Sequence, residues 1–218
     1  MILFFDIERE KMKKKKGFTL AEVLLTMTII GVIAAIAVPT IMHKIRVAEV
    51  ETRLKKAFSV LNQASLNARA VGNDWGIWAG SADGKPNWSN TDDEEFFYNN
   101  YLAPYVSTLK VEGYYNSYVT AYLADGTRLW VGKGGCIDLH VDINGNKGPD
   151  EYGVDLHIFT YCPTATTSYE TDKLIPYADK SIVTREQALN LCKSSGMQCV
   201  KLIMMENWKI PKDYPYSI

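Results

Sequence analysis

The longest uninterrupted apolar stretch of the chain runs from Phe18 to Val38, and Glu22 is its only formally charged residue. An α-helix needs about 20 residues to cross the hydrocarbon core of a bilayer, so this stretch is long enough to span a membrane. Four consecutive lysines, Lys13 to Lys16, precede it, and basic residues favour the cytoplasmic side of a span. We therefore expect one membrane-spanning segment, with the rest of the chain outside the cytoplasm.

Beyond Val38 the apolar positions recur every three or four residues as far as Val71, which is typical of an amphipathic helix. Pro39 removes one backbone donor, so a kink or local opening is expected there. Gly72 follows the last apolar position and is a helix-ending signal. The pattern predicts one long helix, with a membrane half over residues 18–38 and an amphipathic half over residues 39–71.

The pattern changes to that of β-strands in the second half of the chain. Residues 118–123 and 127–131 flank Asp125-Gly126, a strong hairpin signal. Residues 136–143 alternate between apolar and polar side chains, and residues 154–159 do the same. We predict an α+β fold class, in which an antiparallel sheet of about four strands lays its apolar face on the amphipathic helix.

Shorter elements complete the globular head, which we expect to comprise residues 72–218. Residues 92–102 are predicted to form a short helix. A second helix should begin at Thr184, where the spacing to Gln187 is that of a capping box. Residues 200–203 are predicted to form a last strand.

Charge and motifs narrow the possible functions. The 218-residue chain has a formal net charge of -1, but residues 1–17 hold six of its 24 basic residues and three of its 25 acidic residues. The remainder is therefore mildly acidic and has no general electrostatic reason to bind nucleic acid. The sequence contains no nucleophile elbow, phosphate loop or HExxH zinc motif, so we expect no enzymatic activity.

Glu22 needs an explanation, because a charge in mid-bilayer costs at least about 2.5–3.5 kcal/mol on insertion scales and is retained mainly when it has a partner. An ordinary secretory signal, cut near Ala34 to Ala37, would not need this carboxylate. The run Lys-Gly-Phe-Thr-Leu-Ala-Glu, residues 16–22, followed by the apolar helix, resembles the N-terminal signature of type IV pilins and type II secretion pseudopilins. The resemblance covers roughly residues 13–60 and implies the pilin fold.

In that family a prepilin peptidase removes a leader peptide, here residues 1–17, by cutting after the glycine that corresponds to Gly17. The new N-terminal residue, here Phe18, is then methylated. The resemblance implies that Glu22 neutralises the Phe18 amine of a neighbouring subunit during assembly, which makes a buried charge tolerable. It also implies the partners: like or related pilin subunits in a homo- or hetero-polymer, prepilin peptidase, the inner-membrane assembly machinery and, before assembly, membrane lipid.

The segment Asp142 to Asp155, DINGNKGPDEYGVD, places oxygen donors at alternate positions between glycines that permit tight turns. Such a donor set suits Ca²⁺, which takes six to eight oxygen ligands. The segment resembles the calcium loop of type II secretion pseudopilins, which implies Ca²⁺ as a cofactor. The expected side-chain ligands are Asp142, Asn144, Asn146, Asp150 and Asp155. The alternative is a hairpin loop without metal, because Asx and Gly residues favour turns in any case.

All four cysteines, Cys136, Cys162, Cys192 and Cys199, follow the apolar stretch. A location outside the cytoplasm favours disulfides, and four cysteines allow three pairings. The expected hairpin brings Cys136 within one residue of Cys162, and Cys192 and Cys199 can pair locally. We favour these two bridges.

Two histidines lie in the strands of the same expected hairpin. If Asp142 faces Asp155, His140 faces His157 on the polar side of the sheet. A transition-metal site is conceivable for such a pair, but two partly exposed histidines on a solvated face are the preferred interpretation.

These observations favour a structural subunit, a pilin or pseudopilin that polymerises through its N-terminal helix at the bacterial inner membrane. The alternatives are a minor pilin whose head serves adhesion or DNA uptake, and an exported protein held by an ordinary signal anchor. The sequence leaves open whether the filament is a pilus or part of a type II secretion system. The calcium-type loop favours the secretion pseudopilins.

Overall fold

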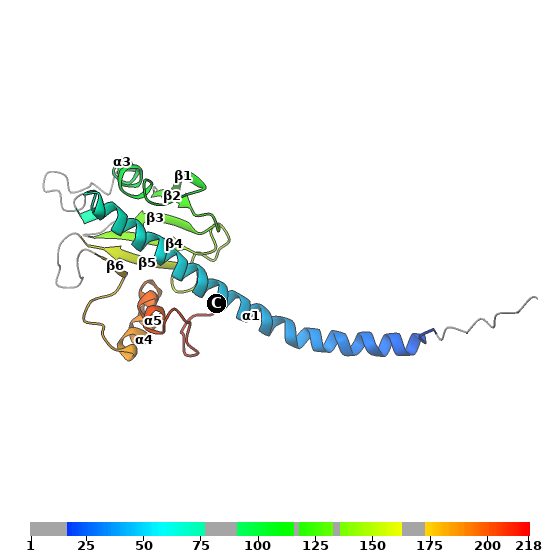
Figure 1. The fold of residues 1–218 in the computed structure, drawn as a ribbon. Coiled ribbons are helices and arrows are strands. Elements are labelled where there is room, and N and C mark those ends of the chain that lie inside the picture. The colour runs from blue at the N-terminus through cyan, green and yellow to red at the C-terminus, as the bar shows by residue number, and fades with distance from the viewer. Residues whose placement is uncertain (1–16, 77–90, 116–117, 133–135, 163–172) are drawn as a thin grey trace, which may run out of the picture. The chain divides into compact units, whose positions relative to one another are not determined.

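The computed structural model describes residues 17–76, 91–115, 118–132, 136–162 and 173–218 (Figure 1). The chain divides into two compact units, Met1–His43 and Lys44–Ile218. The expected leader lies, up to residue 16, outside the described residues. The boundary between the units falls inside the first helix, so the amphipathic half predicted from the sequence belongs almost entirely to the globular unit.

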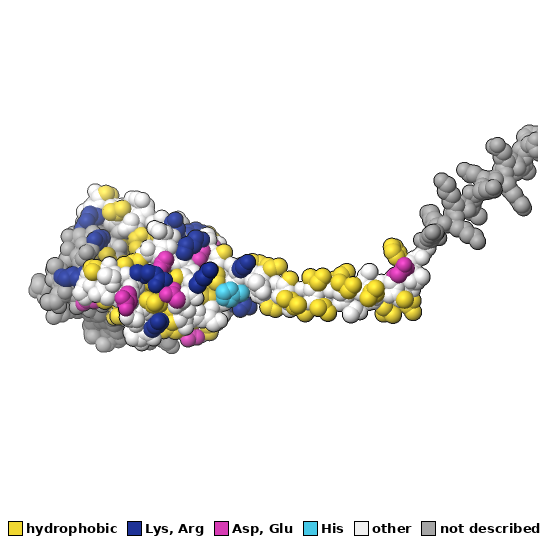
Figure 2. Space-filling view, turned by 90° about the horizontal axis from the view of Figure 1, so that it is seen from below, with side chains coloured by type: hydrophobic (Ala, Val, Ile, Leu, Met, Phe, Trp, Pro, Cys, Tyr) yellow, Lys and Arg dark blue, Asp and Glu magenta, His cyan; other side chains and the backbone are white. Residues whose placement is uncertain are grey.

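The first unit contains the start of α1, which spans Leu20–Ala70 and continues without a break through Pro39. Its apolar side chains are exposed from the start of the helix as far as Ile45, and Figure 2 shows them covering the visible face of this unit. Among the described residues, α1 is the one helix long and apolar enough to cross a membrane. The predicted membrane half is therefore helical and needs a covering that the described residues do not supply.

The second half of α1 is amphipathic, as predicted. Its buried apolar residues recur at steps of three and four and are Val50, Leu54, Ala57, Leu61, Ala64 and Ala68. Gly72 lies just beyond the end of the helix, and its φ of 76° places it in the left-handed region. The amides of Gly72 and Asn73 donate to the carbonyls of Arg69 and Ala68, the paired bonds of a Schellman motif.

Over the described residues the sheet has six strands in sequence order, and every neighbouring pair is antiparallel (Figure 1). The strands are β1 (Lys110–Tyr115), β2 (Tyr118–Tyr122), β3 (Arg128–Gly132), β4 (Ile137–Asp142), β5 (Leu156–Tyr161) and β6 (Leu174–Pro176). Within the globular unit, Phe58 of α1 packs on Phe159 of β5 with ring centroids 5.2 Å apart. The helix therefore covers one face of the sheet, which confirms the α+β class and agrees with a pilin fold.

The prediction of about four strands was too low. The sequence argument missed β6, which is three residues long and ends in Pro176. It also missed β1, which contains Gly113 and an irregular register beside it. Short strands and strands interrupted by glycine give little alternation to detect.

Further helices in the described part of the chain are α3 (Thr91–Phe97), the π-helix η1 (Tyr98–Leu102), α4 (Arg185–Ser194), the 3₁₀-helix η2 (Gly196–Gln198) and α5 (Cys199–Met205). Thr184 caps α4, and with Gln187 it forms the predicted capping box. The last strand predicted at residues 200–203 is wrong, because this segment is part of α5. Cys199, Leu202 and Ile203 are buried at steps of three and four, which is a helical spacing that the short apolar run concealed.

Candidate functional site

The residues predicted for processing and assembly lie just before α1 and in its first turn. Gly17 and Phe18 precede the helix, and the Phe18 side chain is 87% exposed. One carboxylate oxygen of Glu22 accepts the Thr19 amide at 2.8 Å and the Thr19 hydroxyl at 2.9 Å. The Glu22 amide donates to the Thr19 hydroxyl oxygen at 3.2 Å. Glu22 therefore closes a capping box on its own helix, and the Thr-x-x-Glu spacing was a sequence signal for it that we did not use.

The predicted metal loop connects β4 to β5, and the observed register differs from the expected one. Asp142 lies opposite Leu156, and Val141 lies opposite His157. The prediction that Asp142 faces Asp155 was therefore wrong by one residue. Asp155 is not in the strand: its carbonyl accepts the Ile143 amide at 3.0 Å, and its side chain turns into the loop.

The one-residue shift separates the two histidines, because directly opposed residues share a sheet face and successive residues alternate. His140 is paired with Ile158, so His157 points to the other face. His157 is fully buried, and burial lowers its pKa to about 4, an effect that the Val154 backbone opposes in part. His140 stacks on Trp130 with ring centroids 5.2 Å apart. The predicted pair of partly exposed histidines does not exist.

Three carboxylates converge in the loop. Asp142, Asp150 and Asp155 each offer an oxygen atom within 4.8 Å of the other two. Asp142 has no exposed side-chain surface, and its Oδ1 accepts the amides of Asn144 and Gly145 at 3.1 Å each. Gly145 has a φ of 69°, and a Cβ there would lie 2.6 Å from the Gly126 carbonyl oxygen. The turn can therefore close only with glycine at this position.

Asp155 holds the returning end of the loop. Its carboxylate accepts the backbone amides of Asp150 at 3.1 Å and Glu151 at 2.7 Å. The side-chain amide of Asn144 donates to it at 2.9 Å. The Asn144 Oδ1 atom is buried and has no hydrogen-bond partner. An acceptor without a donor beside three carboxylates is an atom that a cation would satisfy.

The sequence argument missed Arg128, whose guanidinium lies among these carboxylates. Its Nη2 atom is 2.5 Å from an Asp142 oxygen and 3.0 Å from an Asp150 oxygen. Its Nη1 atom is 3.4 Å from Asn146 Oδ1, and the Arg128 side chain is only 4% exposed. The pKa of Asp142 is raised to about 6 by burial, and Asp155 and Asp150 add to this rise while Arg128 opposes it.

The donor set fits a hard divalent cation. Three carboxylates and one guanidinium leave a formal charge of about -2, and calcium is bound through such oxygen ligands. Asn146, the fifth predicted ligand, is instead engaged by Arg128 and by the Tyr122 hydroxyl at 2.9 Å. The structure therefore brings together four of the five predicted ligands.

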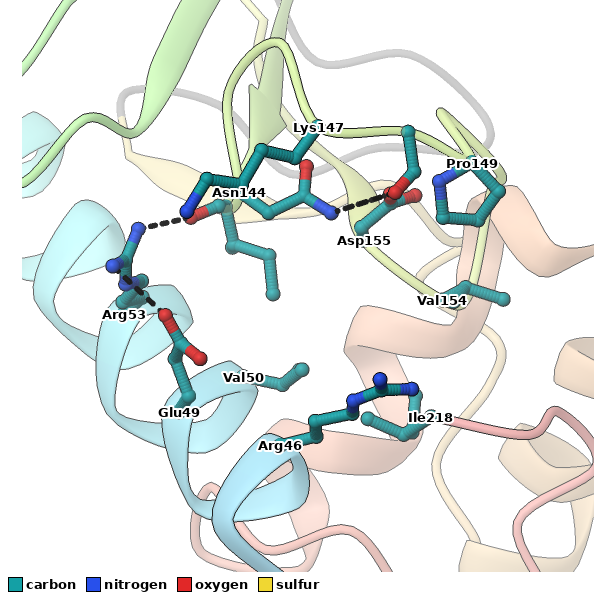
Figure 3. A pocket seen from close by; sticks show the side chains of 12 residues that line it. Arg46, Glu49, Val50, Arg53, Asn144, Lys147, Pro149, Val154, Asp155 and Ile218 are labelled. Atoms are coloured by element: carbon teal, nitrogen blue, oxygen red, sulfur yellow. Dashed lines mark hydrogen bonds and ion pairs between the residues drawn. The ribbon is translucent and has the colours of Figure 1, made fainter. Parts of the chain in front are cut away.

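An opening leads to one side of this loop. Asn144 and Asp155 line a pocket of about 340 Å³, and Figure 3 shows them facing Glu49 and Arg53 of α1. Arg53 pairs with Glu49 at 2.8 Å and donates to the Ile143 carbonyl at 2.7 Å. The pocket therefore reaches the side of the loop formed by Asn144 and Asp155, while the Asn144 Oδ1 atom itself is buried.

Both favoured disulfides are present. Cys136 and Cys162 join β4 and β5 one position beyond the last paired residues, with their Cα atoms 4.4 Å apart. This bridge closes the hairpin at the end opposite the loop. Cys192 and Cys199 join α4 to α5.

Two family models match the chain. One is described as a family of unknown function, DUF6613, and matches residues 40–218. The other is the prokaryotic N-terminal methylation motif and matches residues 12–38. The latter is the type IV pilin and pseudopilin signature, so the resemblance seen in the sequence is confirmed. Neither the curated proteins nor the solved structures include a match to this chain.

Proposed function

The chain belongs to the family of unknown function DUF6613 and carries the prokaryotic N-terminal methylation motif over residues 12–38, and we propose that it is a structural filament subunit and not an enzyme. One observation carries the proposal: the motif coincides with a helix whose apolar side chains are exposed. Such a surface is stable only in lipid or against other helices. Lipid covers it before assembly, and the helices of like or related subunits cover it in the filament.

The proposed path begins with prepilin peptidase, which cuts after Gly17 and leaves Phe18 to be methylated. The subunit then waits in the inner membrane as a single span with its head outside the cytoplasm. The two disulfides support this orientation, because such bridges persist in oxidising compartments. The assembly machinery next moves the subunit into a pilus-like or type II secretion filament. The calcium-type loop favours the secretion filament.

Along this path the Glu22 carboxylate has different partners before and after assembly. Before assembly, the Thr19 amide and hydroxyl satisfy the carboxylate but leave its charge unpaired. In the filament, the Phe18 amine of a neighbouring subunit supplies the opposite charge. A paired charge costs far less in an apolar surrounding than an unpaired one, so this exchange favours assembly and sets the position of one helix against the next.

Glu22→Gln tests the exchange, because glutamine keeps an acceptor for Thr19 and loses the charge. We expect the variant to be processed and held in the membrane like the wild type. Its filament yield in sheared fractions, measured with processed subunit as the reference, should fall about tenfold or more, since each 1.4 kcal/mol of lost pairing is a factor of ten. Thr26→Ala, another polar change in the same helix, is the matched control. Wild-type filament yield with Glu22→Gln would contradict the proposed role.

We propose in addition that the Asp142–Asp155 loop binds Ca²⁺, with Asp142, Asn144, Asp150 and Asp155 as the side-chain ligands. The ion would neutralise the negative charge of the carboxylates that Arg128 does not neutralise. It would also join the end of β4 to the start of β5. Binding to the folded state alone raises its stability with ligand concentration. The melting midpoint of the full chain should therefore be higher in calcium than in chelator, and Asp155→Asn should reduce the difference. Equal midpoints in the two conditions would refute calcium binding.

A further inference from the structure

The backbone of Arg128 belongs to the sheet and not to the loop. In the strand registers it lies opposite Tyr122 of β2 on one side and opposite Asp142 of β4 on the other. Directly opposed residues share a face, so the three side chains form a row that points toward the loop. Trp130, two residues further along β3, packs its ring 5.2 Å from the guanidinium carbon. The position of the charge is therefore set by strand pairing before any ion arrives.

The contacts of Arg128 are those that a metal ion would otherwise make. The guanidinium reaches Asp142, Asp150 and Asn146, three of the five ligands expected from the sequence. A buried carboxylate without a counter-charge is strongly destabilising, and three close together also repel one another. A single planar guanidinium can hold two carboxylates at once because its N–H donors form a rigid fork.

We propose that Arg128 is a built-in counter-ion of the Asp142–Asp155 loop, which fixes Asp142 and Asp150 so that the loop folds without a metal ion. Arg128 is a positioning residue: it neutralises one of three negative charges and leaves two for the divalent ion. The charge left for a divalent ion matters only if the proposed calcium site exists, whereas the counter-ion role does not depend on that site. Without Arg128, Asp142 and Asp150 lose the ion pairs that the guanidinium makes with them, and the loop depends on calcium.

Thermal unfolding of the full-length chain in detergent, with calcium chloride or with chelator, tests this proposal. In chelator, Arg128→Met should lower the midpoint by about 10 °C, given the effect of breaking a buried pair in a domain of this size. Adding Asp150→Asn to Arg128→Met should recover a large part of that loss, since it removes one repelling charge. In calcium, the midpoint of Arg128→Met should rise by more degrees than that of the wild type.

Two control variants separate charge from packing. Arg53→Met removes another arginine beside the same loop, one paired with Glu49 of α1, and should leave the calcium increment unchanged. Arg128→Lys keeps the charge and should keep a calcium increment close to that of the wild type. Arg128→Gln, which also removes the charge, serves in place of Arg128→Met if that variant fails to fold.

The proposal is overturned if Arg128→Met loses the same number of degrees in calcium and in chelator and Asp150→Asn restores none of them. It is also overturned if calcium raises the melting midpoint of Arg128→Lys by as many degrees as it is expected to raise that of Arg128→Met. If calcium shifts no midpoint, while Asp150→Asn still rescues Arg128→Met in chelator, the counter-ion role is supported and the calcium site alone is refuted. The filament function is untouched by any of these results.

Discussion

Removing the two disulfides one at a time should destabilise the head by different amounts. Cys136 and Cys162 are separated by 26 residues, and Cys192 and Cys199 by seven. In the chain-entropy account, which is one model of disulfide stabilisation, closing loops of these sizes contributes about 3.5 and about 2.4 kcal/mol. At roughly 2–4 °C per kcal/mol for a domain of this size, the losses in melting midpoint are about 7–14 °C and about 5–10 °C.

The assay is thermal or denaturant unfolding of two double variants, Cys136→Ala with Cys162→Ala and Cys192→Ala with Cys199→Ala. Each leaves the other bridge intact, so each is the control for the other. Only the first pair clamps the hairpin that carries the proposed calcium site, so only that variant should also weaken the calcium binding that we propose. Unchanged stability, a larger loss for the 192–199 pair, or equal effects on calcium binding would refute this reasoning.

Two further predictions concern the core and its pH dependence. Leu61→Ala should lower the free energy of unfolding, measured with denaturant, by about 2–5 kcal/mol, because Leu61 is fully buried. The control Leu66→Ala, at a residue that is 49% exposed, should lower it by about 0.5 kcal/mol or less. Equal losses would contradict the packing of α1. Burial raises the pKa of Asp138 from 3.8 to about 6, although the Thr160 hydroxyl opposes the rise. The protonated Asp138 carboxyl therefore contributes its full stabilisation below pH 3.8, and this stabilisation is lost as pH rises through about 6. Between pH 3.5 and pH 7.5, the free energy of unfolding of Asp138→Asn should therefore rise by about 3 kcal/mol relative to that of the wild type. A difference that does not change with pH would contradict the buried, proton-binding carboxyl.

The hydrophobic pattern predicted the long helix well, because its signals are local. The three-to-four spacing up to Val71 and the glycine after it marked the helix and its end to within a residue or two. The strands next to Asp125-Gly126 were also found, since that dipeptide fixes a hairpin. The sequence pattern failed at residues 200–203, where a short apolar run suits a strand and a buried helix equally.

The sequence predicted only those residues of the candidate site that lie within the Asp142–Asp155 loop itself. Four of the five expected ligands meet, because their spacing within one turn-rich segment determines where they lie. Arg128 escaped notice because its contact with Asp142 depends on the pairing of β3 with β4, and no local pattern encodes a cross-strand ion pair. His157 was placed on the wrong face for the same reason, since one residue of register reverses every side chain of a strand.

The mass of the mature N-terminal peptide tests most directly whether this chain is a pilin-type filament subunit. The full chain would be expressed with a prepilin peptidase, recovered from membranes and digested for mass spectrometry. We expect a chain that begins at Phe18 and carries one additional methyl group on its amine. A chain that still begins at Met1, or one cut near Ala37, would contradict the proposal.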